Sequence, residues 1–246
     1  MTEPNSKQID DLLTTVEFQK QSMAAKLNWL RAGVLGANDG IMSTSGLVLG
    51  VAAAPGATAS AILIAGTAAV VAGSISMAGG EYTSVSAQRD SEKAALEVER
   101  KELIENPELE LRELAWFYEQ KGISPEIAIR IAEELTAKDA LKAHAEAELG
   151  IDSEHHVSPT QAALSSFVAF GLGGLLPLIA VTGPWQDFRI QATVASVALA
   201  LILTGFVAAK IGKAKSGRSI VRNLFVSGLT MGITYVIGHL VGTQIV

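Results

Sequence analysis

The sequence predicts an all-α, polytopic membrane protein with five transmembrane helices and a three-helix cytoplasmic insert between spans two and three. Apolar runs with almost no charge cover residues 32–54, 59–80, 162–182, 190–209 and 223–246. Each run is close to the ~20 residues that a helix needs to cross a bilayer. Residues 89–156, between runs two and three, contain 18 Asp+Glu and 9 Lys+Arg, a net charge of −9, whereas the rest of the chain carries +3. Such an acidic insert disfavours nucleic acid and favours cations.

Residues 1–27 precede the spans and show an amphipathic helical pattern. Ile9, Leu12, Leu13 and Val16 follow the i, i+3, i+4, i+7 spacing of a surface helix. Basic residues just before the first span predict a cytoplasmic N-terminus by the positive-inside rule. The chain has no cysteine, which excludes disulfides and thiolate metal sites.

Spans one and two, within residues 28–88, carry the residues expected to line a transport path. Asp39 lies in span one, and an intramembrane acid indicates a functional site because an ionised carboxylate is costly there. Met42 follows it by three residues, and Met77 precedes Glu81 by four on span two. Thioether sulfur suits transition metals better than Mg²⁺ or Ca²⁺. The alternatives are a packing hydrogen bond between Asp39 and Asn38, and methionines that only fill the core.

The acidic domain, residues 89–156, is expected to form three helices. The first extends span two to about Glu105, and the second starts with Pro107 and ends near Lys121-Gly122. Ser124 is expected to cap the third, which runs to Leu149-Gly150.

Side chains of this domain are spaced as metal ligands. His144 and Glu148 lie four residues apart, the spacing by which one helix offers two ligands to one metal. Glu99 and Glu102 lie three residues apart, as do Glu110 and Glu113, so each pair projects from one face of its helix. The predicted ligands are Glu99, Glu102, Glu110, Glu113, His144 and Glu148. The alternative is a solvated acidic face without metal.

Spans three to five fall within residues 157–246. The loop after span four contains Lys210, Lys213, Lys215, Arg218 and Arg222, whereas the loop before it holds one acid and one base. The positive-inside rule therefore places the basic loop and the acidic domain in the cytoplasm, and the C-terminus outside.

Several segments together carry a resemblance to one family. They are Asn38-Asp39-Gly40, Gly73-Ser74-Ile75-Ser76-Met77, the glutamate-rich domain, Ser158-Pro159-Thr160-Gln161-Ala162, Gly173-Gly174-Leu175-Leu176-Pro177 and the basic loop before span five. From Leu27 onward, the chain resembles the vacuolar iron transporter family, which has many bacterial relatives, and we expect a bacterial member in the cytoplasmic membrane.

The resemblance implies a five-span homodimer with the path between subunits, and proton-driven export of Fe²⁺, and of Mn²⁺ in some members, from the cytosol without a prosthetic group. It implies that Asp39 and Met77 form the metal station of the path, and that the matching glutamates of the acidic domain collect metal. Two positions depart from the plant-type pattern. Ala69 stands where that pattern has a glutamate, and the sequence leaves open whether Glu81 compensates for it; His144 stands where the pattern has a methionine.

The leading functional hypothesis is an antiporter that exchanges protons for Fe²⁺, Mn²⁺, Zn²⁺ or a similar divalent ion, with Asp39 as the coupling acid. A carboxyl group can hold either a proton or a metal ion. No nucleotide-binding G-x-x-x-x-G-K-[ST] motif occurs. The alternatives are a metal-sensing or metal-storing membrane protein and a membrane-tethered di-iron oxidase, although the oxidase would need Glu-x-x-His motifs that the chain lacks.

Overall fold

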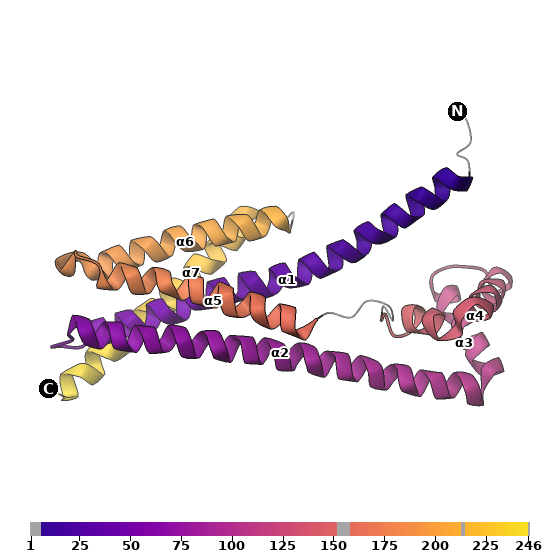
Figure 1. The fold of residues 1–246 in the computed structure, drawn as a ribbon, viewed down its shortest axis with the longest axis horizontal. Coiled ribbons are helices and arrows are strands. Elements are labelled where there is room, and N and C mark those ends of the chain that lie inside the picture. The colour runs from indigo at the N-terminus through magenta and orange to yellow at the C-terminus, as the bar shows by residue number, and fades with distance from the viewer. Residues whose placement is uncertain (1–5, 152–157, 213–214, 246) are drawn as a thin grey trace. The chain divides into compact units, whose positions relative to one another are not determined.

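The computed structural model describes residues 6–151, 158–212 and 215–245, and their side chains from Trp29 onward except at 186, 211 and 245. Within these ranges the chain is helical and contains no strand. The elements are α1 (Ser6–Ala53), α2 (Ala59–Glu105), α3 (Pro107–Gln120), α4 (Pro125–Ala147), α5 (Pro159–Thr182), the 3₁₀ helix η1 (Gln186–Phe188), α6 (Arg189–Ile211) and α7 (Ser216–Ile245) (Figure 1). The side chains of the predicted amphipathic segment, residues 1–27, lie outside the described part.

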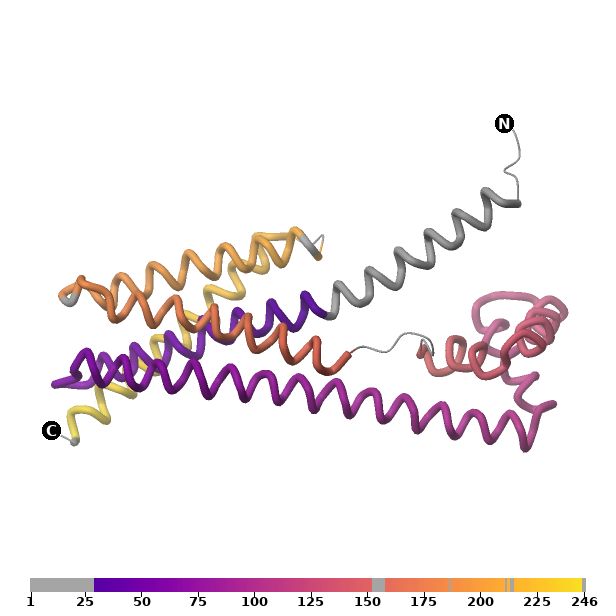
Figure 2. The backbone as a smooth tube through the Cα atoms, viewed as in Figure 1, coloured from indigo at the N-terminus to yellow at the C-terminus, as the bar shows by residue number. Residues whose placement is uncertain are grey.

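The chain divides into two compact units. The first, here called the apolar unit, comprises Met1–Thr83 and Pro159–Val246, and the second, the acidic unit, comprises Ser84–Ser158. Helix α2 contributes residues to both units, because it continues from the second apolar run to Glu105. Figure 2 traces this continuous helix, and also the hairpin in which α5 and α6 are joined through η1.

Four helices among the described residues are long and apolar enough to cross a membrane: α2, α5, α6 and α7. Helix α1 is not one of them, although it contains the first predicted span. Asn38, Asp39 and several Ser, Thr and Gly residues lower its hydropathy. The same helix is nevertheless enclosed by protein, since Thr44, Ser45 and Val48 are almost fully buried.

Helix α1 packs on α5 at backbone contact. A β-carbon on Gly40 would overlap the carbonyl oxygen of Phe170, and one on Gly173 would overlap that of Ala37. Only glycine permits this separation, which is the role of small-residue pairs in membrane helices. The two helices run in the same direction, because Gly33 lies beside Ser165 and Gly40 lies farther along, beside Phe170 and Gly174.

The other helices of the apolar unit alternate in direction. Helix α7 runs parallel to α1, with Gly50 beside Thr234 and Ala54 beside Gly242. Helix α2 runs antiparallel to α5, because Gly66 lies beside Leu178 whereas Gly73 lies beside Phe170. On α6, Thr204 donates a hydrogen bond to Asn38 (2.7 Å), and Leu201 packs with Ile41, so α6 runs antiparallel to α1.

The acidic unit largely follows the predicted boundaries. Pro107 occupies the first turn of α3, and Gly122, with φ +89°, follows its end as predicted. Ser124 stands at the N-cap of α4, but its side chain makes no capping hydrogen bond, so that detail of the prediction is wrong. The sequence also gave no sign of a kink at Asp139 (φ −165°, ψ 94°), where Asp139 Oδ1 accepts a hydrogen bond from the backbone N–H of Lys142 (3.0 Å).

The kink splits α4 and starts a short second segment that carries His144. This segment ends at Ala147, and the φ of +64° at Gly150, just beyond it, allows the backbone N–H of Ile151 to bond to Ala145 O. A separate hydrophobic core holds α3 against α4, built on Leu114, Ala115, Ala128, Ala132 and Ala143. The acidic unit therefore has a core of its own.

The contact between α1 and α5 can be tested with Gly40→Ala. The added methyl group would overlap the Phe170 carbonyl, so we expect the variant to lose about 1–3 kcal/mol of stability, the usual cost of overpacking. Thermal unfolding of the purified protein in detergent measures this. The control is Gly79→Ala, because nothing lies within 4 Å of a β-carbon there and alanine favours the helix. Equal melting temperatures for both variants would contradict the backbone contact.

Candidate metal centre and intramembrane cavity

Four ionisable side chains from three helices meet inside the acidic unit. Glu99 comes from α2, Glu110 from α3, His144 from the second segment of α4, and Glu148 from the residue that ends α4. His144 is fully buried, and Glu99 and Glu110 are 3% and 5% exposed. Carboxylates are almost never buried without a partner, so this burial requires an explanation.

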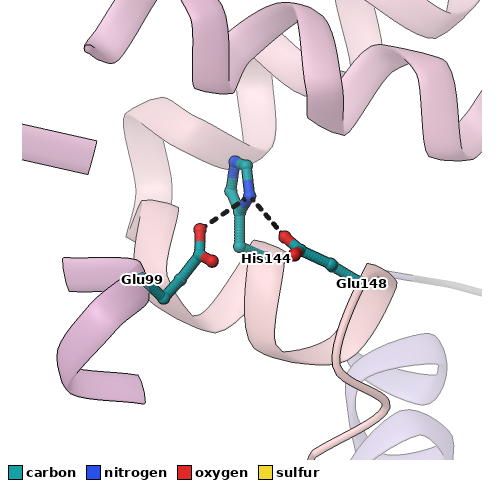
Figure 3. A group of neighbouring side chains, drawn as sticks. All are labelled: Glu99, His144 and Glu148. Carbon is teal, nitrogen blue, oxygen red and sulfur yellow. Dashed lines mark ion pairs between the residues drawn. The ribbon is translucent and has the colours of Figure 1, made fainter. Parts of the chain in front are cut away.

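The ligand atoms of this group converge on one ring nitrogen. His144 Nδ1 lies 2.9 Å from Glu99 Oε1, 3.5 Å from Glu148 Oε2 and 3.8 Å from Glu110 Oε2. Figure 3 shows the carboxylates of Glu99 and Glu148 approaching the same ring nitrogen of His144 from opposite sides. Ligand atoms of Glu99, His144 and Glu148 all lie within 4.8 Å of one another, so the three could hold a metal ion.

The polar atoms of this group lack ordinary hydrogen bonds. Among the described residues, Glu99 Oε1, Glu148 Oε2 and both ring nitrogens of His144 are buried without a contact of hydrogen-bond geometry, although Nδ1 forms ion pairs with the two carboxylates. Buried polar atoms in native proteins are nearly always satisfied, and exceptions point to an ion or another ligand. The donor set therefore fits a cation better than it fits a closed protein network.

Burial and the crowding of carboxylates raise the pKa values of Glu99 and Glu110. Burial and then the charges of Glu148, Glu110, Glu102 and Glu113 raise the pKa of Glu99 to about 7. Burial and the charge of Glu113 also raise the pKa of Glu110, against a smaller lowering by His144. A divalent ion would relieve this repulsion, and it would displace the proton held by Glu99.

Glu102 and Glu113, also predicted as ligands, lie at the edge of the group. Glu102 is exposed and Glu113 half-buried, although both contribute to the raised pKa of Glu99 and so lie within electrostatic reach. The structure thus brings Glu99, Glu110, His144 and Glu148 together and leaves the other two peripheral. One imidazole nitrogen with several carboxylate oxygens suits Fe²⁺, Mn²⁺ or Zn²⁺.

A cavity of about 400 Å³ lies between α1, α2 and α5 of the apolar unit. Its lining includes three of the four residues predicted for the transport path, Asp39, Met77 and Glu81, and also Ala69. Ser43, Ser76 and Phe170 complete its polar and aromatic wall. Sequence spacing could have indicated Ser43, which follows Asp39 by four residues, but Phe170 belongs to a helix distant in the chain and gave no signal.

Met42, the fourth predicted path residue, does not line this cavity. It packs with Ile41, Leu201, Leu224 and Met231, in a hydrophobic cluster formed by α1, α6 and α7. Three residues along a helix rotate a side chain by about 300°, so Met42 is offset by about 60° from Asp39. That offset directs Met42 to α6, which favours the alternative of a methionine that fills the core.

Asn38 and Asp39 also face different neighbours. Asn38 Oδ1 accepts a hydrogen bond from Thr204 of α6, and among the described residues no hydrogen bond joins Asn38 to Asp39. Within the described part of the chain, the Asp39 carboxylate has neither a hydrogen-bond partner nor an ion-pair partner. The second acid of the cavity differs, because Glu81 Oε1 accepts a hydrogen bond from Arg31 Nη2 (2.7 Å).

Comparison with known proteins agrees with the resemblance noted in the sequence. The sequence profile of the VIT family matches residues 30–239. The chain belongs to the VIT family. Among its relatives in the VIT family is a protein of Acanthamoeba castellanii named "Vacuolar iron transporter", 41% identical, with the match covering 95% of this chain and 87% of the relative.

Two plant proteins are further relatives of this VIT-family chain. "Vacuolar iron transporter homolog 5" of Oryza sativa subsp. japonica is 35% identical, over 94% of this chain and 89% of its own length. "Vacuolar iron transporter homolog 2" of Arabidopsis thaliana is 33% identical, over 93% and 90%. The similarity therefore extends over both units.

Metal binding by the acidic unit is testable on residues 84–158, which contain their own core. His144→Ala removes the nitrogen at the centre of the group, so we expect Mn²⁺ affinity to fall at least about tenfold, by isothermal titration calorimetry. Glu126→Gln, which removes an exposed carboxylate at the start of α4, should leave the affinity unchanged. Equal losses in both variants would mean that the carboxylates act only as a diffuse acidic surface.

The raised pKa of Glu99 predicts opposite effects of pH on metal affinity and on the stability of the metal-free unit. Protons compete with metal at Glu99, so Mn²⁺ affinity should fall as the pH falls below about 7. The stability of the metal-free unit, in contrast, should increase as the pH falls. Its Glu99 pKa is raised from 4.5 to about 7, so protonation of Glu99 favours the folded state. This contribution to the free energy of unfolding is complete below about pH 4.5 and is lost as the pH rises through about 7.

Urea unfolding of the metal-free unit from about pH 5 to about pH 8 checks this second effect. Glu99→Gln mimics the protonated acid and should flatten the curve. A metal-free wild-type unit that gains stability as the pH rises would contradict the raised pKa.

Proposed function

We propose that this VIT-family chain is a proton-coupled antiporter that exports Fe²⁺, and also Mn²⁺ or a similar divalent transition metal, from the cytoplasm. The observation that carries the proposal is the position of Asp39. Its side chain lines a cavity formed by α1 and the candidate membrane helices α2 and α5, which the thioether-bearing Met77 also lines, and it has no protein partner among the described residues. An unpaired intramembrane acid is costly and indicates function.

Five spans are part of the proposal, with the N-terminus and the acidic unit in the cytoplasm and the C-terminus outside. Helices α1, α5 and α7 share one direction in the apolar unit, and α2 and α6 have the opposite direction. Such alternation is what five successive crossings produce. It supports counting α1 as the first span although its hydropathy is low, because protein rather than lipid surrounds much of it.

Exchange at Asp39 provides the minimal chemistry of antiport. A carboxylate can bind a proton or a metal ion, but the two compete for the same oxygen atoms. Met77 adds a soft sulfur ligand, which favours a transition metal over Mg²⁺. The acidic unit would raise the local concentration of metal through Glu99, Glu110, His144 and Glu148.

A homodimer is also proposed. The acidic unit exposes Val98, Ile104, Leu109, Trp116 and Ile127, which are large apolar side chains on a unit outside the predicted spans. Exposed apolar residues of this kind are typical of protein interfaces. Their burial in a second copy of the chain agrees with the dimer implied by the family resemblance.

The alternative functions are less well supported. A di-iron oxidase of the ferritin type uses two Glu-x-x-His motifs, whereas the group described here contains one histidine, His144. A metal sensor or store would need the acidic unit but would not explain Asp39 and Met77 in an intramembrane cavity. Oxygen consumption with Fe²⁺ tests the oxidase, and flux across a membrane separates a transporter from a sensor.

The proposed coupling acid is tested with Asp39→Asn in proteoliposomes under an imposed pH gradient. Asparagine keeps the size of the side chain but cannot exchange a proton for a metal ion. We expect Fe²⁺ flux to fall at least about tenfold, equivalent to roughly 1.4 kcal/mol in the barrier. Asp187→Asn, at an exposed position of η1, is the matched control and should retain flux. Wild-type flux in Asp39→Asn would mean that another group couples protons to metal.

A further inference from the structure

The carboxylate of Glu81 has two neighbours, the cavity on one side and an arginine on the other. Glu81 lines the cavity and is 7% exposed, whereas Arg31 lies outside the lining and its side chain is 57% exposed. Arg31 Nη2 donates to Glu81 Oε1 at 2.7 Å. Both residues belong to the apolar unit, so this bond joins α1 to α2 within one compact body.

The position of the pair along the helices places it at one end of the cavity. Arg31 precedes Asp39 by eight residues on α1, and Glu81 follows Met77 by four on α2. At 1.5 Å per residue, Arg31 lies about 12 Å along the helix axis from Asp39. Both residues lie at the ends of their spans that are predicted to face the cytoplasm. A cation that reaches Asp39 from that side encounters Glu81 first.

We propose that Arg31 competes with the metal ion for Glu81, which makes the ion pair a gate at the cytoplasmic end of the cavity. This inference rests on the proposed transport function. The guanidinium holds Glu81 while the cavity lacks metal, and an incoming divalent ion displaces it. An ion with two charges interacts with the carboxylate about twice as strongly as one with a single charge at equal distance. Arg31 therefore favours admission of divalent ions and also limits how tightly they stay bound.

A purely structural role for the pair makes a different prediction. The bond from Arg31 to Glu81 could simply fasten α1 to α2, and its loss would then lower stability without altering the concentration of metal that the transporter requires. Competition predicts instead that loss of Arg31 leaves a buried, unpaired carboxylate that binds metal more tightly. The measured KM for metal separates the two roles.

The experiment uses the full chain in proteoliposomes, with Mn²⁺ as the transported ion. In Arg31→Gln we expect KM to fall by roughly three- to fivefold, the range for a partly exposed ion pair, with a lower maximal rate because the ion leaves Glu81 more slowly. In Glu81→Gln, KM should rise. Arg31→Lys keeps the charge and should stay close to wild type, and Arg222→Gln, an exposed arginine of the same unit outside the cavity, should not change KM.

The double variant Arg31→Gln/Glu81→Gln decides the assignment. If Arg31 acts through Glu81, the double variant should have the KM of Glu81→Gln alone. An equal fall in KM on removing Arg31 in both backgrounds would overturn the proposal, and so would a lower melting temperature of Arg31→Gln with an unchanged KM.

Equilibrium Mn²⁺ binding provides a readout that does not depend on flux. It is measured on the same full-length variants in detergent, in a background with Glu99→Gln and His144→Ala, which removes the site in the acidic unit. Tighter binding in Arg31→Gln that disappears in the double variant supports the gate, and equal binding in wild type and Arg31→Gln overturns it. Absence of Mn²⁺ flux in the wild type would refute the proposed function, while the binding comparison would still decide the role of Arg31.

Discussion

Backbone contact between α1 and α5 is the constraint on which the apolar unit depends. Glycines at positions 40 and 173 allow the two helices to approach until a β-carbon on either would overlap a facing carbonyl. This approach buries part of α1, including the polar residues Thr44 and Ser45, against other helices. Asn38 reaches Thr204 on one side and Asp39 reaches the cavity on the other. Glycine and polar residues therefore both lower the hydropathy of α1 and make its contacts with the neighbouring helices.

A different constraint acts on the acidic unit, because several carboxylates lie close together in its buried interior. Glu99 and Glu110 each come from a separate helix, and the kink at Asp139 starts the short segment that brings His144 and Glu148 to them. Burial, and then the charges of neighbouring carboxylates, raise the pKa values of Glu99 and Glu110, so the metal-free fold loses stability as the pH rises to neutral. A bound cation would relieve this repulsion, so under the proposed function metal collection would also stabilise the domain.

Much of this arrangement could be predicted from sequence, and the exceptions have physical reasons. Helix ends at Pro107 and Gly122 follow from local chemistry, as does the pairing of His144 with Glu148 at a spacing of four. Met42 could not be placed, because residues three and four positions after Asp39 lie at about 60° and 40° from it on opposite sides, and only the location of α6 decides between them. The kink at Asp139 and the contribution of Phe170 depend on tertiary contacts that no local pattern records.

The two acids of the cavity explain how this chain differs from the plant-type pattern. Ala69 and Glu81 both line the cavity, but twelve residues separate them on α2, or roughly 18 Å along the helix. Glu81 therefore lies at a different level of α2 from position 69, and its carboxylate is bonded to Arg31. The middle is left with one carboxylate, Asp39, and one thioether, Met77. Mg²⁺ and Ca²⁺ require several hard oxygen ligands, whereas a softer transition-metal ion gains from the sulfur. Under the proposed function, the absence of a glutamate at position 69 should thus increase the preference for transition metals over Mg²⁺ and Ca²⁺, because sulfur becomes a larger share of the ligand set.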